Sequence, residues 1–415
     1  MVLGELDSDG VHHEDTDDES AKEGENAIKA DVDELVKNPI HALVSYRSRS
    51  PTASLHGRGK SRSNSPFRSS KGSRLARGRS LRTARRYDKV VECLTRPDVN
   101  IADLRKLAWS GLPSELRPIA WPLLLGYLPL PQSSRLQTLA RKREEYASLV
   151  KLTFSRGRDG LDQHIWHQIE IDVPRTRPGV PLWMEGGTQR SLERILYVWA
   201  IRHPASGYVQ GINDLVTPFY EVFLSAYINC DPEQFDPSYL PEHVLNAVEA
   251  DSFWCLSRLL DGIQDNYISQ QPGIHRSVRR MQDLVMRIDA PLAAHLQAEG
   301  VEFMQFAFRW MNCLLMREIS VANTIRMWDT YLAEGTDAFS QFHLYVCSAF
   351  LVKWSEKLRN MDFQGIIMFL QSLPTQDWTD HDVELLLSEA FLLNSVWHNA
   401  QSHFSASTKV TMNGR

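Results

Sequence analysis

IEIDVPRTRPGVPLWMEGGTQRSLERILYVWAIRHPASGYVQGINDL, residues 169–215, is the stretch from which the organisation of this chain follows. Two polar loops frame a central run with helical spacing. The apolar face of that run consists of Leu192, Ile195, Leu196 and Trp199. Thr188 marks its start and Pro204 its end. The pattern predicts one amphipathic helix of about thirteen to sixteen residues that holds the two loops side by side.

Each of these loops carries a set of polar side chains. The first, called the arginine loop below, contains Asp172, Arg175 and Thr176. The second, called the glutamine loop, contains Tyr208, Gln210, Gly211, Asn213 and Asp214. Arginine has a permanently charged planar fork that fits phosphate, and glutamine can accept from a water while it donates to a phosphate oxygen. Phosphoryl transfer needs little more from a protein than this charge and this orientation of the attacking water.

The chain contains no nucleotide-binding motif of its own. Neither GxxxxGK[ST] nor GxGxxG after a strand occurs in it. The chain thus offers an arginine and a glutamine suited to phosphate chemistry but has no motif that would bind the nucleotide. Both facts are consistent with side chains that act on a nucleotide held by another protein.

The two loops resemble the catalytic core of the TBC domain, which is the Rab GTPase-activating domain. The family's IxxDxxRT block is matched by Ile169, Asp172, Arg175 and Thr176, and its YxQ-Gly block by Tyr208, Gln210 and Gly211. A third block, with Trp-Asp in an apolar helix, is similar to RMWDTYLAEG at residues 326–335. The opening segment of the family is similar to WSGLPSELRPIAWPLLLGYLP at residues 109–129. Three blocks in the family's order make the resemblance specific, and it extends from Leu104 to the neighbourhood of Asn399.

The resemblance implies an all-α fold with a single multi-helix domain over residues 87–400. It implies a protein that accelerates GTP hydrolysis by Rab-family small GTPases in vesicle traffic. Arg175 and Gln210 are then the catalytic residues, supplied in trans, with Gln210 taking the place of the GTPase's own switch glutamine. Supporting roles fall to Asp172, Thr176, Tyr208, Gly211, Asn213 and Asp214. No cofactor or metal of its own is expected, since GTP and Mg²⁺ are carried by the Rab partner.

Arg177-Pro178 departs from the Phe-Pro that many family members carry after Arg-Thr. The form IDxPRTxP is similar to a Golgi-associated subgroup, so the expected location is cytoplasmic, peripheral at Golgi or other endomembranes. The N-terminus MVLGELDSDG lacks an apolar h-region, and no uninterrupted apolar run reaches membrane-spanning length. Membrane contact is therefore expected to be indirect.

Two other classes of function compete with GTPase activation. A non-catalytic Rab-binding scaffold or effector is the alternative, and it is disfavoured because the chain keeps both Arg175 and Gln210. A metal hydrolase or nucleophilic enzyme lacks support, because neither HExxH nor GxSxG occurs. The sequence does not identify the Rab substrate or the oligomeric state.

Charge is distributed unevenly along the 415 residues. Residues 1–46 carry a net charge of −10 and residues 47–86 carry +13, which leaves −8 on the remainder and gives the total of −5. The first segment is acidic and poor in aromatics, and the second is rich in arginine and serine. Both compositions predict disorder, because neither can bury enough apolar surface to offset the entropy of ordering. Residues 401–415 are predicted to be a frayed C-terminal tail.

The Arg/Ser-rich segment has three interpretations that the sequence leaves open. It can be a solvated flexible tail, an adsorbing segment for anionic lipid head groups, or a phosphorylated docking site. Ser50 and Ser65 each precede a proline in RSxSP contexts, which resemble 14-3-3 adaptor sites with the proline displaced by one position. Nucleic-acid binding is not expected, since only Tyr46 and Phe67 are available for stacking.

Outside the two loops, the residues that stand out are expected to be structural or to have no specific chemical role. Arg117 is expected to form a structural ion pair, and Trp328-Asp329 to be a scaffold pair. His164 and His167 are expected to be surface residues, because no third metal ligand has supporting spacing. The 5 cysteines form no CxxC and predict reduced thiols. Residues 229–243 are predicted to form a proline-rich surface insertion. It either contributes to the selection of the partner or is a loop without a specific function.

Overall fold

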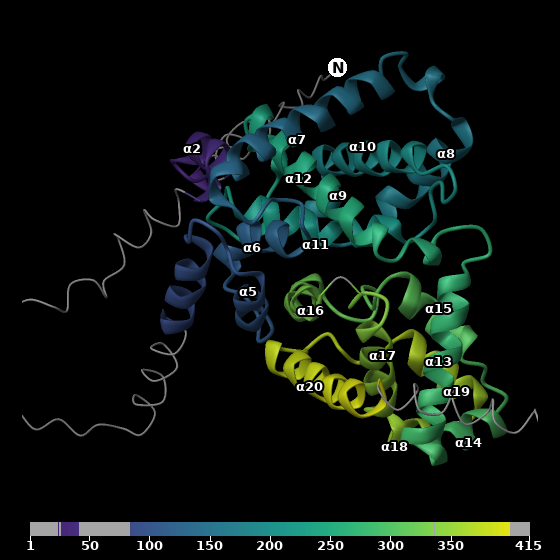
Figure 1. Cartoon of the computed structure of the whole chain (residues 1–415). Coiled ribbons are helices and arrows are strands. Elements are labelled where there is room, and N and C mark those ends of the chain that lie inside the picture. The colour runs from purple at the N-terminus through teal and green to yellow at the C-terminus, as the bar shows by residue number, and fades with distance from the viewer. Residues whose placement is uncertain (1–23, 25, 41–83, 336, 399–415) are drawn as a thin grey trace, which may run out of the picture.

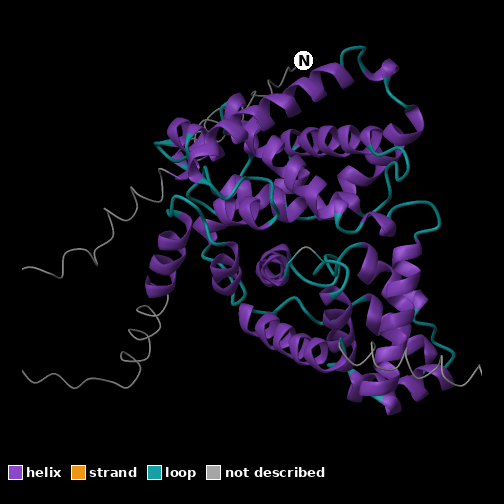
Figure 2. Cartoon of the chain, in the orientation of Figure 1, coloured by secondary structure: helices purple, strands orange, loops and turns teal. Residues whose placement is uncertain are grey.

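The computed structural model describes residues 24, 26–40, 84–335 and 337–398, and among these it contains helices and loops but no strand (Figures 1 and 2). The all-α prediction is therefore confirmed. The longer helices of the first half are α5 (Ile101–Ala108), α6 (Arg117–Leu124), α7 (Gln132–Thr153), α8 (Gln163–Asp172), α10 (Gly186–Arg202), α11 (Ile212–Ser225) and α12 (Glu242–Asp261). Those of the second half are α13 (Pro272–Ile288), α14 (Ala290–Ala298), α15 (Met304–Asn312), α16 (Val321–Glu334), α17 (Phe342–Val352), α19 (Phe363–Gln371) and α20 (Asp380–Trp397). Short helices are α2 (Val32–Lys37), α9 (Pro181–Met184) and α18 (Ser355–Leu358).

The helices form two groups. Helices α6 to α12 lie together, and α13 to α20 form a second group in which α16 lies between α11 and α20 (Figure 1). Helix α11 packs against α10 and α12 of its own group and against α16 of the other group. It therefore links the two halves of the domain.

Helix α11 is buried along nearly its whole length, from Ile212 to Leu224. Most of its residues are apolar, as expected of a central helix, but the polar residues Asn213, Asp214, Thr217 and Glu221 are buried along one side of it. Pro218 lies inside it and has no N–H for the carbonyl of Asp214. The hydroxyl of Thr217 donates to that carbonyl at 2.8 Å, so the helix continues past the proline. Because the helix begins at Ile212, it fixes the position at which the glutamine loop ends.

Asp329 of α16 joins the third sequence block to the entry segment. Its carboxylate accepts from the Leu112 N–H at 2.8 Å, from the Trp121 indole N–H at 2.8 Å and from the Arg117 guanidinium at 3.0 Å. Burial raises the pKa of Asp329, and the positive charge of Arg117 opposes that rise. Arg117 thus has the structural pairing that its sequence context predicted, and Trp328-Asp329 belongs to the scaffold as expected.

The predicted tail over residues 1–46 differs from the structure at residues 26–40, which are ordered against the domain. Ile28 forms an antiparallel bridge with Ile228, and the N–H of Lys29 donates to the Tyr227 carbonyl at 2.9 Å. The buried apolar residues of the segment are Val32, Leu35 and Ile40. The prediction failed here because these apolar residues are scattered among acids, so the average composition hides them. Residues 1–23 lie outside the described part of the chain.

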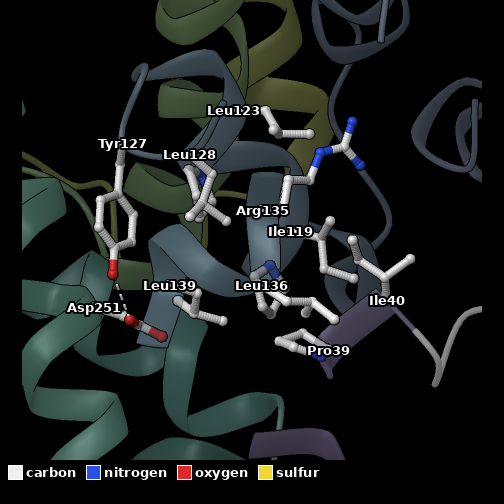
Figure 3. Close-up of a pocket in the computed structure, with 12 residues that line it drawn as sticks. Pro39, Ile40, Ile119, Leu123, Tyr127, Leu128, Arg135, Leu136, Leu139 and Asp251 are labelled. Carbon is white, nitrogen blue, oxygen red and sulfur yellow. Dashed lines mark hydrogen bonds between the residues drawn. The ribbon is translucent and has the colours of Figure 1, made fainter. Parts of the chain in front are cut away.

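Lys29 and the end of this segment make specific contacts. The Lys29 ammonium donates to the carbonyls of Ser225 and Ala226, at 3.0 and 2.8 Å, at the C-terminal end of α11. Pro39 and Ile40 border an opening of about 410 Å³ that is lined mainly by apolar residues of α6 and α7 (Figure 3). None of its lining residues belongs to the arginine or glutamine loop.

The second predicted tail also needs a correction. Residues 84–94 are helical, so the ordered domain begins before the expected boundary at residue 87. Residues 41–83, with Ser50 and Ser65, and the tail after residue 398 lie outside the described residues.

Other local predictions have mixed outcomes. His164 and His167 are exposed on α8, as predicted. Residues 229–243 do not lie wholly on the surface, because Phe235, between two short 3₁₀ turns, and Leu240, directly after the second turn, are buried. Within the described residues, no helix is both long enough and apolar enough to span a membrane.

Candidate functional site

The arginine loop begins where α8 ends. Asp172 is the last residue of that helix, and a 3₁₀ turn over Val173–Arg175 follows it directly. Thr176 closes the turn, since its N–H donates to the Val173 carbonyl at 3.0 Å and its hydroxyl to the Asp172 carbonyl at 3.3 Å. The Arg175 side chain is exposed and forms no hydrogen bond or ion pair with any described residue. The loop therefore has a fixed backbone and a guanidinium that is free to bind.

The buried carboxylate of Asp172 connects the arginine loop to the glutamine loop. Its Oδ2 accepts from the Tyr208 hydroxyl at 2.9 Å, and its Oδ1 accepts from Nε2 of Gln210 at 3.3 Å. Burial raises the pKa of Tyr208, and the negative charge of Asp172 raises it further. The hydroxyl therefore keeps its proton and acts as a donor.

Asn213 provides a second connection between the loops. Its Nδ2 donates to the Thr176 hydroxyl oxygen at 2.9 Å, and its Oδ1 accepts from the Gly211 N–H at 3.1 Å. Asn213 is only 2% exposed, so water does not compete for these bonds. Asn213 therefore fixes the position of Thr176 relative to Gly211.

Gln210 does not lie in a helix. Helix α11 begins only at Ile212, because Gly211, directly before it, has a φ of 106° that lies outside helical geometry. A Cβ atom at position 211 would lie 2.6 Å from Nδ2 of Asn312, so the position also has no space for a side chain. The glutamine side chain is exposed, and its loop is shaped by this glycine.

A third segment, residues 312–319, contacts both loops, and we call it the brace. Nδ2 of Asn312 donates to the Gln210 carbonyl at 2.9 Å. Arg317 donates through Nε to Asp214 at 2.8 Å, which forms an ion pair at the start of α11. Asp214 therefore bonds to the brace and not to the arginine loop.

Arg177 connects the arginine loop to the same brace. Its guanidinium donates to the carbonyl of Ile319 at 3.2 Å and to that of Met316. Burial lowers the pKa of Arg177, and the surrounding carboxylates Asp214 and Glu221 oppose that effect. Arg177, which stands where many family members carry phenylalanine, thus anchors the loop that carries Arg175.

The structure brings together most of the predicted site residues. Asp172, Thr176, Tyr208, Gln210, Gly211 and Asn213 form one connected set of hydrogen bonds. Arg175 lies in the same loop but does not pair with Asp172, whose carboxylate accepts from Tyr208 and Gln210. The sequence analysis missed Asn312 and Arg317, which lie within and directly after the mainly apolar run FMQFAFRWMNCLLM at residues 303–316. The single asparagine within that apolar run and the Arg-Glu pair after it were the available signals.

The profile of the Rab-GTPase-TBC domain family matches residues 114–359, which is more than half of the chain. The chain belongs to the Rab-GTPase-TBC domain family. Its TBC domain is 59% identical over 321 residues to the GTPase-activating protein gyp1 of Schizosaccharomyces pombe, covering 77% of this chain and 62% of that protein. It is 50% identical over 326 residues to TBC1 domain family member 22B of Homo sapiens, covering 78% and 64% respectively. The chain thus spans less than two thirds of the length of these relatives.

Solved structures support the assignment of the TBC fold. The crystal structure of the Ypt/Rab-GAP domain of Gyp1p matches with a TM-score of 0.73 at 53% identity, covering 76% of this chain and 99% of that one. The TBC domain of a Chlamydomonas flagellar RabGAP matches with a TM-score of 0.54 at 19% identity, which supports the fold alone.

Proposed function

We propose that this protein is a GTPase-activating protein for Rab-type small GTPases. The observation that carries the proposal is the joint presentation of Arg175 and Gln210, two exposed side chains on loops connected through Asp172. The names of the relatives support it, since gyp1 is called a GTPase-activating protein and the solved relative a Ypt/Rab-GAP domain. Catalysis in this proposal belongs to the complex, with GTP and Mg²⁺ held by the Rab partner.

Arg175 acts on the charge that develops in the transition state. Its guanidinium enters the partner's nucleotide site and stabilises the oxygens between the β- and γ-phosphates, which become more negative as the bond breaks. Because no carboxylate of the described residues pairs with Arg175, no ion pair within this part of the chain has to be broken first. The ordered turn around Pro174 also reduces the entropy lost when the side chain is immobilised.

Gln210 orients the attacking water. Its amide oxygen accepts a proton of that water while Nε2 donates to the nucleotide. In the free protein Nε2 is occupied by Asp172, in a hydrogen bond whose length of 3.3 Å is at the weak end of the normal range. Binding of the partner exchanges this contact for one to the nucleotide or the partner's backbone. Asp172 thus holds the glutamine near its working position until the partner arrives.

The resemblance of the IDxPRTxP form supports peripheral Golgi attachment as part of the proposal. A separate hypothesis is that an adaptor of the 14-3-3 type binds the protein when Ser50 or Ser65 is phosphorylated.

Single-turnover GTP hydrolysis on a panel of GTP-loaded Rab proteins tests the activity. Wild type, Arg175→Ala and Gln210→Ala are compared with Arg359→Ala and Gln364→Ala, which truncate exposed residues of the same type on or next to α18 and α19. The proposal expects acceleration of one or a few Rabs by wild type and by both control variants, and its loss in both loop variants. GTP-dependent binding without acceleration of any Rab would replace the proposal by the scaffold function.

A further inference from the structure

The peptide group between Gln210 and Gly211 is held at both of its polar atoms. Its carbonyl accepts from Nδ2 of Asn312 at 2.9 Å, and its N–H donates to Oδ1 of Asn213 at 3.1 Å. A peptide plane bonded at both ends cannot rotate without breaking one of these bonds. Since the Gln210 side chain leaves from the atom next to this plane, the plane sets the direction in which the side chain projects.

Asn312 is itself fixed by its surroundings. The residue is 5% exposed, and its backbone carbonyl accepts from the Tyr267 hydroxyl at 2.8 Å. The amide of Gln271 lies 3.5 Å from Oδ1 of Asn312, so the oxygen has a donor while Nδ2 faces the Gln210 carbonyl. The side chain amide is therefore oriented before any partner binds.

Backbone strain gathers around the same residue. The non-glycine residues with positive φ in the described chain are Arg177, Gln270, Gln271, Leu314 and Leu315. Leu314 and Leu315 follow Asn312 in the brace, Gln271 contacts Asn312, and Arg177 donates to the brace. Such a conformation is strained for a residue with a side chain and is retained where the surrounding structure determines it, most often at functional sites. The strained turn ends α15 at Asn312 and places the amide beside the glutamine loop.

We propose that Asn312 is a positioning residue for Gln210. It fixes the Gln210–Gly211 peptide so that the glutamine side chain projects toward the partner's nucleotide. Asn312 touches neither nucleotide nor water and acts only through Gln210. The inference rests on the proposed GTPase-activating function, and it adds a residue outside the sequence blocks that identify the site.

The test is a double-mutant cycle in single-turnover GTP hydrolysis on an accelerated Rab. Asn312→Ala is measured alone and in the Gln210→Ala background, at a range of protein concentrations. The matched control is Asn323→Ala, because Asn323 is also a buried asparagine whose Nδ2 donates to a main-chain carbonyl, that of Trp378 at 3.0 Å. We expect Asn312→Ala to lower the maximal rate roughly 10- to 100-fold with little change in the half-saturating concentration. In the Gln210→Ala background it should have no further effect.

Two kinetic results would overturn the inference. One is an equal fall in rate with and without Gln210, which would mean that Asn312 acts independently of the glutamine. The other is a raised half-saturating concentration at unchanged maximal rate, which would make Asn312 a docking residue. The Asn323→Ala control shows how much of either change in the kinetics is due to a general loss of stability.

A second measurement keeps the inference testable if no Rab is accelerated. Backbone amide exchange of the protein alone should increase at residues 208–213 in Asn312→Ala and remain unchanged in α17, which lies in the buried core. Unchanged exchange at residues 208–213 would show that the peptide is fixed without Asn312. Failure of the wild type to accelerate any Rab would reject the proposed function, whereas failure of the exchange result would reject the positioning role alone.

Discussion

The Gln210 amide lies 3.3 Å from the carboxylate of Asp172, while Arg175, three positions after that aspartate in the chain, has no acidic partner among the described residues. The glutamine is therefore held and the arginine is free. The difference follows from geometry, since both oxygens of the buried carboxylate already accept from the glutamine loop. Arginine is permanently charged and needs no activation, whereas a neutral amide works only if its orientation is set.

Replacing Arg175 by lysine should be almost as harmful as replacing it by alanine. An arginine supplied in trans contributes about 10³ to 10⁵ in rate, and lysine keeps the charge but loses the planar fork. Single-turnover hydrolysis on the accelerated Rab measures this, and thermal unfolding should be unchanged because the side chain is exposed. A lysine variant that retains near-wild-type rates would show that charge alone is sufficient.

Tyr208→Phe should destabilise the site and slow hydrolysis without abolishing it. The substitution leaves Oδ2 of buried Asp172 without its donor at 2.9 Å, which costs about 1–3 kcal/mol of unfolding free energy. Denaturant titration measures the loss, with Tyr239→Phe as a control because its hydroxyl makes no hydrogen bond to a described residue. Equal stability of the two variants would contradict the proposed role of the hydroxyl.

Asp329→Asn should lower the free energy of unfolding by about 3 kcal/mol or more, because Arg117 would remain partly buried without its charged partner. The exposed pair of Asp265 and Arg276 gives the comparison, and Asp265→Asn should cost no more than about 1 kcal/mol. Chemical denaturation of both variants provides the measurement. If both variants lose a similarly small amount of unfolding free energy, the contacts of residue 329 to Leu112 and Trp121 stabilise the fold without the ion pair to Arg117.

His343 should make the protein sensitive to mild acid. Burial lowers its pKa to about 4, and the ring lies 2.8 Å from the Tyr331 hydroxyl and 3.0 Å from the Trp310 carbonyl. Between the ordinary pKa near 6.5 and about 4, the unfolded chain binds a proton at this residue and the folded chain does not. Stability therefore falls as the pH falls through this window, by about 2 kcal/mol between pH 7 and pH 4.5. Unfolding titrations at both values should show this loss in wild type and a smaller one in His343→Gln.

Lys29→Met should loosen the N-terminal segment. The ammonium satisfies two carbonyls at the end of α11, and hydrogen bonds from a charged donor contribute about 1.5–3 kcal/mol. Methionine keeps the apolar stem, so cleavage within residues 26–40 by limited proteolysis should accelerate while the melting of the helical core changes little. Unaltered proteolysis would show that the apolar contacts of Val32, Leu35 and Ile40 hold the segment alone.

The sequence determined the parts of the site that are local in the chain. Helical spacing and loop residues placed Asp172, Arg175 and Gln210 on two neighbouring loops, and family blocks added the fold. The sequence could not reveal Asn312, because its bond to Gln210 spans 102 positions and depends on a turn that only the folded chain forms. Leu314 and Leu315 adopt a backbone conformation that no propensity favours for leucine. Residues 26–40 were misjudged for a similar reason, since the bridge of Ile28 to Ile228 and the bond of Lys29 to Tyr227 join them to a distant part of the chain.

The position of the brace has a consequence for synthesis of the chain. During translation Arg175 and Gln210 leave the ribosome well before Asn312 and Arg317. Helices α16 to α20, which follow the brace in the chain, are made later still. A nascent or prematurely ended chain can therefore display Arg175 and Gln210 while the orientation of the two side chains is undefined. The orientation of Gln210 should become fixed late and abruptly during translation, when Asn312 of the brace bonds to a glutamine loop that was made 102 residues earlier.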